Sequence, residues 1–172
     1  MIKALSPWDF DKVFAIMEES FPKDERRPYE GQRALLEDPA YHIYVEADSD
    51  DRVLGFIALW QLDNFRFIEH LACAGAYRNK GLGAKLLQFV LDGSRQLVCL
   101  EVERPETPLS IRRIGFYERN GFLLNPYSYA QPPLCSGQSP VPLFLMTSGR
   151  RISEAEFASI RDTLYRRVYH AL

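Results

Sequence analysis

A glycine-containing turn between an apolar strand and an amphipathic helix is the feature that most restricts the fold of this chain. The sequence predicts a strand from Phe65 to Cys73, a loop from Ala74 to Lys80 and a helix from Gly81 to about Gly93. The buried stripe of this helix is expected to consist of Leu82, Leu86, Phe89 and Val90. A strand that enters a helix through a tight turn is part of a layered architecture, so the chain is predicted to be α/β.

The other elements alternate in the same way along the chain. Before the loop we expect a short strand, two helices and an antiparallel hairpin, at Ile2–Leu5, from Ser6 to Phe21, at Tyr29–Glu37, and at Tyr41–Glu46 with Val53–Leu62. After it we expect a central strand, a helix, a strand with a long loop and a further strand, at Leu97–Val102, Leu109–Asn120, Phe122–Ser139 and Val141–Thr147. A capping box, Ser153 with Glu156, predicts a last helix with the apolar face Phe157, Ile160, Leu164 and Val168.

Composition narrows the class of protein. The 172 residues carry 21 Lys and Arg against 23 Asp and Glu, a net charge of −2, so no bulk affinity for nucleic acid is expected. No apolar stretch approaches the ~18 residues of a membrane span, and no signal-peptide core follows Met1, which predicts a cytoplasmic protein. The three cysteines and three histidines have no metal-ligand spacing, so we expect no metal site and reduced thiols. The length fits one domain, residues 1–172.

The loop can hold a phosphate group. Glycines allow a tight turn, and the free N–H groups at a helix start attract an anion. A P-loop needs Gly-Lys-Ser/Thr, but Leu82 follows Gly81, and a dinucleotide fingerprint needs Gly or Ala where Leu86 stands. Both nucleotide motifs are therefore excluded, and the remaining alternative is a glycine-rich surface turn that only begins a helix.

The loop resembles the acyl-CoA motif of the GNAT superfamily of N-acetyltransferases, Arg/Gln-x-x-Gly-x-Gly/Ala, through Arg78, Gly81 and Gly83. Ile68–Ala72 is similar to that family's fourth strand, and Phe116–Phe122 to its late helix that ends in a Tyr and a Gly-Phe pair. The resemblance covers residues 2–147 and implies a mixed sheet of six or seven strands with splayed middle strands and about four helices. The helix at about 153–170 would be a C-terminal extension.

The resemblance also implies a binding site for acetyl-CoA without a metal. The pyrophosphate would lie on the backbone of Arg78, Asn79, Lys80, Gly81, Leu82, Gly83 and Ala84, with added charge from the Arg78 and Lys80 side chains. The pantetheine arm would bind the strand edge Leu71-Ala72-Cys73, where the Leu71 amide would stabilise the oxyanion. Ser110 stands where the family often has an Asn that contacts this arm.

Two residues are candidates for proton transfer. The resemblance places Tyr117 at the general-acid position, and the alternative is a core tyrosine with a bonded hydroxyl. Glu69 would be the general base, or else have a structural or acceptor-binding role, and Glu101 and Glu103 compete with it as the base. Strand alternation predicts that His70 faces away from Glu69 and packs in the interior.

The expected reaction is direct transfer of an acetyl group to a primary amine of a small molecule or peptide. The acceptor would lie between Phe21–Pro28, with Glu25, Arg26 and Arg27, and Asn125–Gly137, with Tyr127, Tyr129 and Gln131. Rival functions are a catalytically silent acyl-CoA-binding regulatory module, and a transferase with another acyl donor or an oxygen acceptor. The apolar stripe of the last helix is compatible with its own sheet or with a homodimer.

Overall fold

The computed structural model describes residues 1–171, which form two compact units, Met1–Gln96 and the chain from Leu97 onward. The described residues contain seven strands and five α-helices, which agrees with the predicted α/β class. None of these helices is both long and apolar enough to cross a bilayer.

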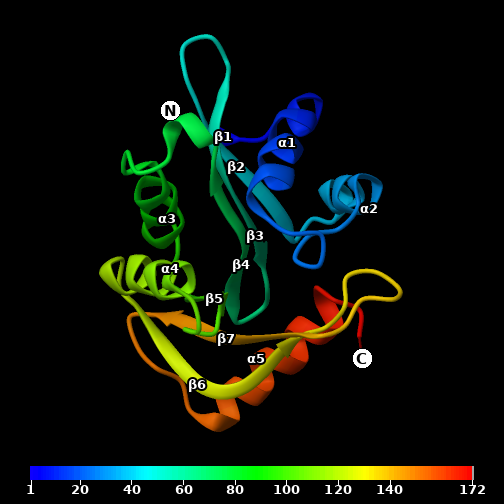
Figure 1. Cartoon of the computed structure of the whole chain (residues 1–172), viewed down its shortest axis with the longest axis vertical. Helices are drawn as coiled ribbons and strands as arrows, with labels where there is room; N and C mark the ends of the chain where they lie inside the picture. The colour runs from blue at the N-terminus through cyan, green and yellow to red at the C-terminus, as the bar shows by residue number, and fades with distance from the viewer. Residues whose placement is uncertain (172) are drawn as a thin grey trace. The chain divides into compact units, whose positions relative to one another are not determined.

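The first unit is a four-stranded antiparallel sheet with helices on both faces. Its strands are β1 (Ile2–Ala4), β2 (Tyr41–Ala47), β3 (Val53–Gln61) and β4 (Phe65–Cys73), in the order β1-β2-β3-β4. Helices α1 (Phe10–Ser20) and α2 (Tyr29–Ala34) lie on one side of this sheet, and α3 (Leu82–Asp92) covers the other (Figure 1). Short 3-10 turns occupy Pro7–Asp9 (η1), Leu35–Glu37 (η2) and Gly75–Tyr77 (η3).

The core of the first unit follows the predicted apolar periodicity in α1 and in part of α3. Helix α1 buries Val13, Phe14 and Met17, as expected. Helix α3 buries Leu86 and Val90 as expected, but Leu82 is only half-buried, and Leu87 replaces Phe89 in the buried set. Phe89 is 39% exposed and packs edge-on against Tyr44 of β2 instead.

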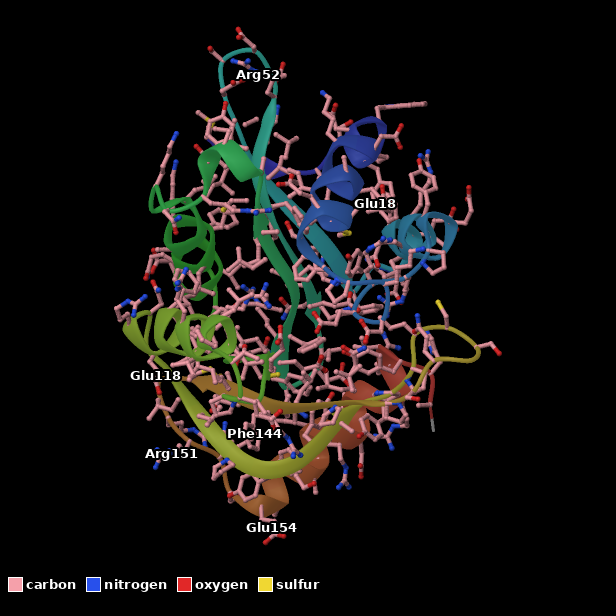
Figure 2. The ribbon with its side chains drawn as sticks, in the orientation of Figure 1. Glu18, Arg52, Glu118, Phe144, Arg151 and Glu154 are labelled. Carbon is pink, nitrogen blue, oxygen red and sulfur yellow. The ribbon has the colours of Figure 1, made fainter. Side chains whose placement is uncertain are left out.

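The turn between β2 and β3 is held by its own acidic residue. Asp48 Oδ1 accepts hydrogen bonds from the backbone N–H of Asp50 and of Arg52, at 2.9 and 3.0 Å. Arg52 lies at the far end of the hairpin (Figure 2) and returns a side-chain contact to Asp48 at 2.8 Å. These bonds explain why an acidic run forms a tight turn here.

The second unit is a three-stranded antiparallel sheet, β5-β7-β6, with two helices packed against it. Its elements are β5 (Leu97–Glu103), α4 (Pro108–Arg119), β6 (Phe122–Gln131), β7 (Val141–Ser148) and α5 (Glu154–Arg167). Helix α4 contacts β5 and β6, and α5 contacts β6. The capping box and the four buried apolar residues predicted for the last helix are confirmed in α5 and at its C-cap.

Strand β6 is longer than its sequence suggested. It continues to Gln131, although Pro126 and a register shift interrupt its pairing with β7 between Asn125 and Tyr129. The fully buried Asn125 bridges the gap, since its amide donates to the Leu145 carbonyl and to Thr147 Oγ1. A side chain thus replaces ladder bonds that the irregular segment cannot make.

Candidate active site

The loop before α3 has the backbone geometry of an anion site. Asn79 and Gly81 both adopt positive φ, at 61° and 79°, so the chain turns twice within three residues. Gly81 is the N-cap of α3 and has no side chain with which to cap the first turn. The first amides of a helix lack intrahelical partners, and they are available to a ligand at this end of α3.

Helices α4 and α5 differ from α3 in this respect. Their N-termini are closed by reciprocal capping boxes, Thr107 with Ser110 and Ser153 with Glu156. The start of α3 is uncapped and is the positive end of the helix dipole. The residues of the loop and of the first turn of α3 therefore fit a pyrophosphate group.

The charged side chains of the loop are partly engaged within the first unit. Arg78 donates to Glu19 Oε1 of α1 at 3.0 Å and to the Cys73 carbonyl at 3.3 Å. Lys80 lies over the ring of Tyr77, with its Nζ 5.4 Å from the centroid. The loop therefore has one cation already paired with a carboxylate, and backbone amides are its main source of attraction for phosphate.

The C-terminal part of β4, Leu71 to Cys73, leads directly into this loop. Its register places Leu71 opposite Ile57 and Cys73 opposite Gly55 of β3. A Cβ on Gly55 would lie 2.9 Å from the Ala72 carbonyl oxygen and 3.1 Å from Leu82 Cδ2. The absence of a side chain at Gly55 therefore lets β4 and α3 approach β3 closely. No sequence motif indicated this requirement.

Cys73 is a thiol in these surroundings. Burial raises its pKa, and the nearby Arg78 only partly opposes that effect. A protonated thiol is a poor nucleophile. Cys73 is therefore poorly suited to act as a covalent nucleophile.

Glu69 is a buried carboxylate with both oxygens occupied. Arg27 Nη1 lies 2.6 Å from Oε1, and Trp60 Nε1 donates to Oε2 at 3.2 Å. The side chains of Glu69 and Arg27 are only 5% and 11% exposed. Burial alone would raise the pKa of Glu69, but the charge of Arg27 and the hydrogen bonds from Arg27 and Trp60 outweigh it and hold the pKa below its ordinary value.

The prediction that His70 faces away from Glu69 is wrong. The pairing of β3 with β4 shifts register between Ala58 and Leu59, which face His70 and Ile68, so Glu69 is an extra residue in β4. Such a bulge breaks the two-residue alternation, and His70 Nδ1 lies 4.0 Å from Glu69 Oε2. His70 is a bonded interior residue, as expected, with Nε2 2.9 Å from the Glu25 carbonyl oxygen.

Tyr117 and Ser110 both lie on α4 of the second unit. The Tyr117 ring packs against Phe116 and Phe122, and its hydroxyl makes no hydrogen bond within residues 1–171. Burial raises the pKa of Tyr117 to about 12, with Arg113 opposing it. This tyrosine is therefore protonated at neutral pH, and its hydroxyl is not bonded as that of a purely structural tyrosine would be.

Ser110 has its hydrogen-bonding groups committed within α4. Its hydroxyl donates to the Thr107 carbonyl at 2.9 Å and accepts from the Thr107 amide at 3.1 Å, and it lies 3.1 Å from Thr107 Oγ1. A contact between Ser110 and pantetheine would require this cap to open.

The two predicted acceptor segments are more ordered than a solvated charge run would be. In the first unit, Arg26 lies over the Phe14 ring at 5.7 Å and donates to the Phe21 carbonyl at 3.3 Å. In the second unit, Tyr127 donates to the Ile152 carbonyl and Tyr129 to Glu101, at 2.9 and 2.6 Å. Tyr129 also lines a cavity of about 590 Å³ together with Arg104, Ser128, Ala130, Pro142, Arg161, Asp162 and Tyr165.

Comparison with known proteins agrees with these features. The sequence model of the acetyltransferase (GNAT) family matches residues 10–122. A GNAT-family protein from Bacteroides thetaiotaomicron is 32% identical over 100% of this chain and 99% of that one, with a TM-score of 0.90. No curated protein matches.

More distant solved structures share the fold. The ribosomal-protein-S18-alanine N-acetyltransferase of Escherichia coli is 17% identical, with a TM-score of 0.67 over 90% of this chain and 96% of that one. A mutant spermidine N-acetyltransferase of Vibrio cholerae is 16% identical, with a TM-score of 0.65 over 86% and 91%. The family match and the 32% identical relative show that this chain belongs to the GNAT acetyltransferase family.

Proposed function

We propose that this chain is an acetyl-CoA-dependent N-acetyltransferase that acts on a primary amine by direct attack. The observation that carries the proposal is the uncapped start of α3, which follows a loop with two positive-φ residues. Membership of the family supports acetyl-CoA as the donor, and two distant structural relatives are named for amine acceptors, spermidine and a ribosomal-protein alanine.

Each proposed site residue has a distinct role. The backbone of Arg78 to Ala84 would bind the pyrophosphate, and Leu71, Ala72 and Cys73 would bind the pantetheine arm. The Leu71 amide would donate to the thioester oxygen as negative charge develops on it. Only the resemblance places Ser110 beside the arm, because the Ser110 hydroxyl is already hydrogen-bonded in the cap of α4.

Tyr117 is proposed as the proton donor. Acetyl-CoA supplies a thioester whose carbonyl carbon an amine nitrogen can attack, with release of a thiolate that must take up a proton. The Tyr117 phenol carries that proton at neutral pH and has no competing acceptor within residues 1–171. The proton lost by the amine nitrogen then restores the phenol through solvent.

Calorimetry with acetyl-CoA tests the donor site. We expect micromolar binding to the native chain and no binding to a Gly81→Glu, Gly83→Glu double variant, whose side chains occupy the phosphate site. Gly149→Glu is the control, since Gly149 also has positive φ, at 72°, with open space around it, but lies in the turn after β7. No binding to a folded native chain would refute the proposal.

A panel of amines tests the reaction. Acetylation of at least one amine, followed by thiol release, would support transfer. Tight acetyl-CoA binding with no turnover across spermidine, amino acids and peptides with free N-termini would favour the regulatory module instead.

A further inference from the structure

The segment Phe21–Pro28, between α1 and α2, is attached to β4 through Phe21, Glu25 and Arg27. Phe21 packs edge-on against the His70 ring, with centroids 4.7 Å apart. The Glu25 carbonyl oxygen lies 2.9 Å from His70 Nε2, and the Arg27 guanidinium lies 2.6 Å from the Glu69 carboxylate. The bulge in β4 makes this possible, because it allows two successive side chains to reach one segment.

The protonation state of His70 follows from its hydrogen-bond partner, the Glu25 carbonyl. A carbonyl oxygen can only accept, so Nε2 must carry the ring proton and Nδ1 has a lone pair. This Nδ1 is buried without a hydrogen-bond partner within residues 1–171, and burial lowers the pKa of His70. His70 is thus a neutral donor to the segment.

The contacts of Glu69 make it a poor proton acceptor. An amine proton would have to reach an oxygen that already accepts from Arg27 or from Trp60. The neighbouring guanidinium stabilises the carboxylate anion and so weakens it as a base. Breaking this buried pair on one side would leave an uncompensated charge, which is costly.

We infer that Glu69 is a positioning residue that fixes Arg27, and through it the segment Phe21–Pro28, rather than the base that deprotonates the amine. This inference rests on the proposed function and on the expectation from the sequence that the segment Phe21–Pro28 forms part of the acceptor site. It assigns amine deprotonation to solvent, so the enzyme takes the acceptor in its neutral form. The substrate class it favours is therefore amines with a substantial neutral fraction at the working pH.

Kinetics of three variants test the inference. Glu69→Gln and Arg27→Gln should each raise the acceptor KM at least tenfold while kcat stays within threefold. The double variant should be no worse than either single variant, because both changes break the same contact between Arg27 and Glu69. A 100-fold or larger fall in the turnover of Glu69→Gln, not matched by Arg27→Gln, would overturn the inference.

The pH profile of kcat/KM is a second test, because a purely structural role of Glu69 would not change it. With two acceptors of different amine pKa, the acidic limb of kcat/KM should follow the amine and should persist in Glu69→Gln. An acidic limb that has the same pKa for both acceptors and is lost in Glu69→Gln would identify Glu69 as the base. If Glu69→Gln does not fold, Arg27→Lys is used, with a threefold to tenfold rise in KM expected and a loss in kcat alone contradicting the inference.

Hydrogen exchange separates this inference from the proposed function. Without any substrate, the amides of residues 21–28 should exchange at least tenfold faster in Glu69→Gln than in the native chain, while those of α3 stay unchanged. Unchanged exchange in that segment would refute the positioning role, whether or not an acceptor is found. Failure to find any acceptor would refute the proposed function and leave the exchange result standing.

Discussion

Glu19 of α1 accepts a hydrogen bond from the Arg78 guanidinium at 3.0 Å, which pairs the only arginine of the loop at 78–84 with a carboxylate. Both side chains are about half exposed, at 50% and 47%. Exposed ion pairs of this kind contribute little to stability, and here the pair also reduces the net charge offered to a phosphate.

The first prediction compares a side chain with the backbone of that loop. Arg78→Gln should weaken acetyl-CoA binding by less than about fivefold, because Glu19 already offsets the charge of Arg78. Gly81→Val should weaken it by more than tenfold, because a β-branched residue resists the φ of 79° that turns the amides of the loop. Calorimetry checks both, and a larger loss in Arg78→Gln would show that the side chain dominates.

The second prediction concerns the close approach at Gly55. Gly55→Ala places a Cβ 2.9 Å from the Ala72 carbonyl and 3.3 Å from the Cys73 Cα, which are backbone atoms and cannot rotate away. We expect a loss of about 1–3 kcal/mol in the free energy of unfolding and weaker acetyl-CoA binding.

Gly31→Ala is the matched control for that substitution. Its Cβ would meet only Arg27 Cβ, at 3.6 Å, an ordinary contact on α2. Denaturant unfolding should show no loss for Gly31→Ala. Equal losses for the two variants would contradict the packing argument.

The fold was largely predictable because its elements have clear local signals. The apolar periodicity of α5 and the Ser153–Glu156 capping box predicted the start of that helix closely, although the helix ends at Arg167 rather than near residue 170. The glycines and the flanking strand and helix likewise predicted the turn between β4 and α3.

The contacts of the site were not predictable, since each depends on residues far apart in sequence or on a local competitor. The charge run at 23–28 was expected only as an acceptor segment, and nothing in the sequence indicated that Arg27 pairs with Glu69, which is 42 residues away. The bulge at Glu69 overrode the alternation that placed His70 on the other face. The Ser110 hydroxyl hydrogen-bonds to Thr107 in the cap of α4, and a family motif does not indicate that contact.

The third prediction concerns the pH dependence of Tyr117. Because burial raises the pKa of Tyr117 to about 12, the phenol keeps its proton from about pH 6 to 10. Tyr117→Phe should reduce turnover about 100-fold, by the same factor throughout that range, and should spare acetyl-CoA affinity.

Tyr77→Phe is the control for loss of a phenol, since Tyr77 lies in η3 and has no proposed role in proton transfer. Its kcat should stay within twofold of the native value. A factor for Tyr117→Phe that shrinks as the pH rises towards 10 would mean that Tyr117 ionises in that range, and an unchanged kcat would remove it from the mechanism.

The fourth prediction concerns the chain after α5. Tyr169 donates to both oxygens of Glu101 on β5, at 2.7 and 2.9 Å, and Tyr129 donates to Oε1 at 2.6 Å. Hydrogen bonds to a charged acceptor contribute about 1.5–3 kcal/mol, so Tyr169→Phe should lower the free energy of unfolding by that amount. Tyr165→Phe removes a bond to the neutral carbonyl of Ala130 and should cost about 0.5–1.5 kcal/mol. Denaturant titrations of the two variants decide the point: if Tyr165→Phe costs as much as Tyr169→Phe, the charge of Glu101 does not stabilise this attachment.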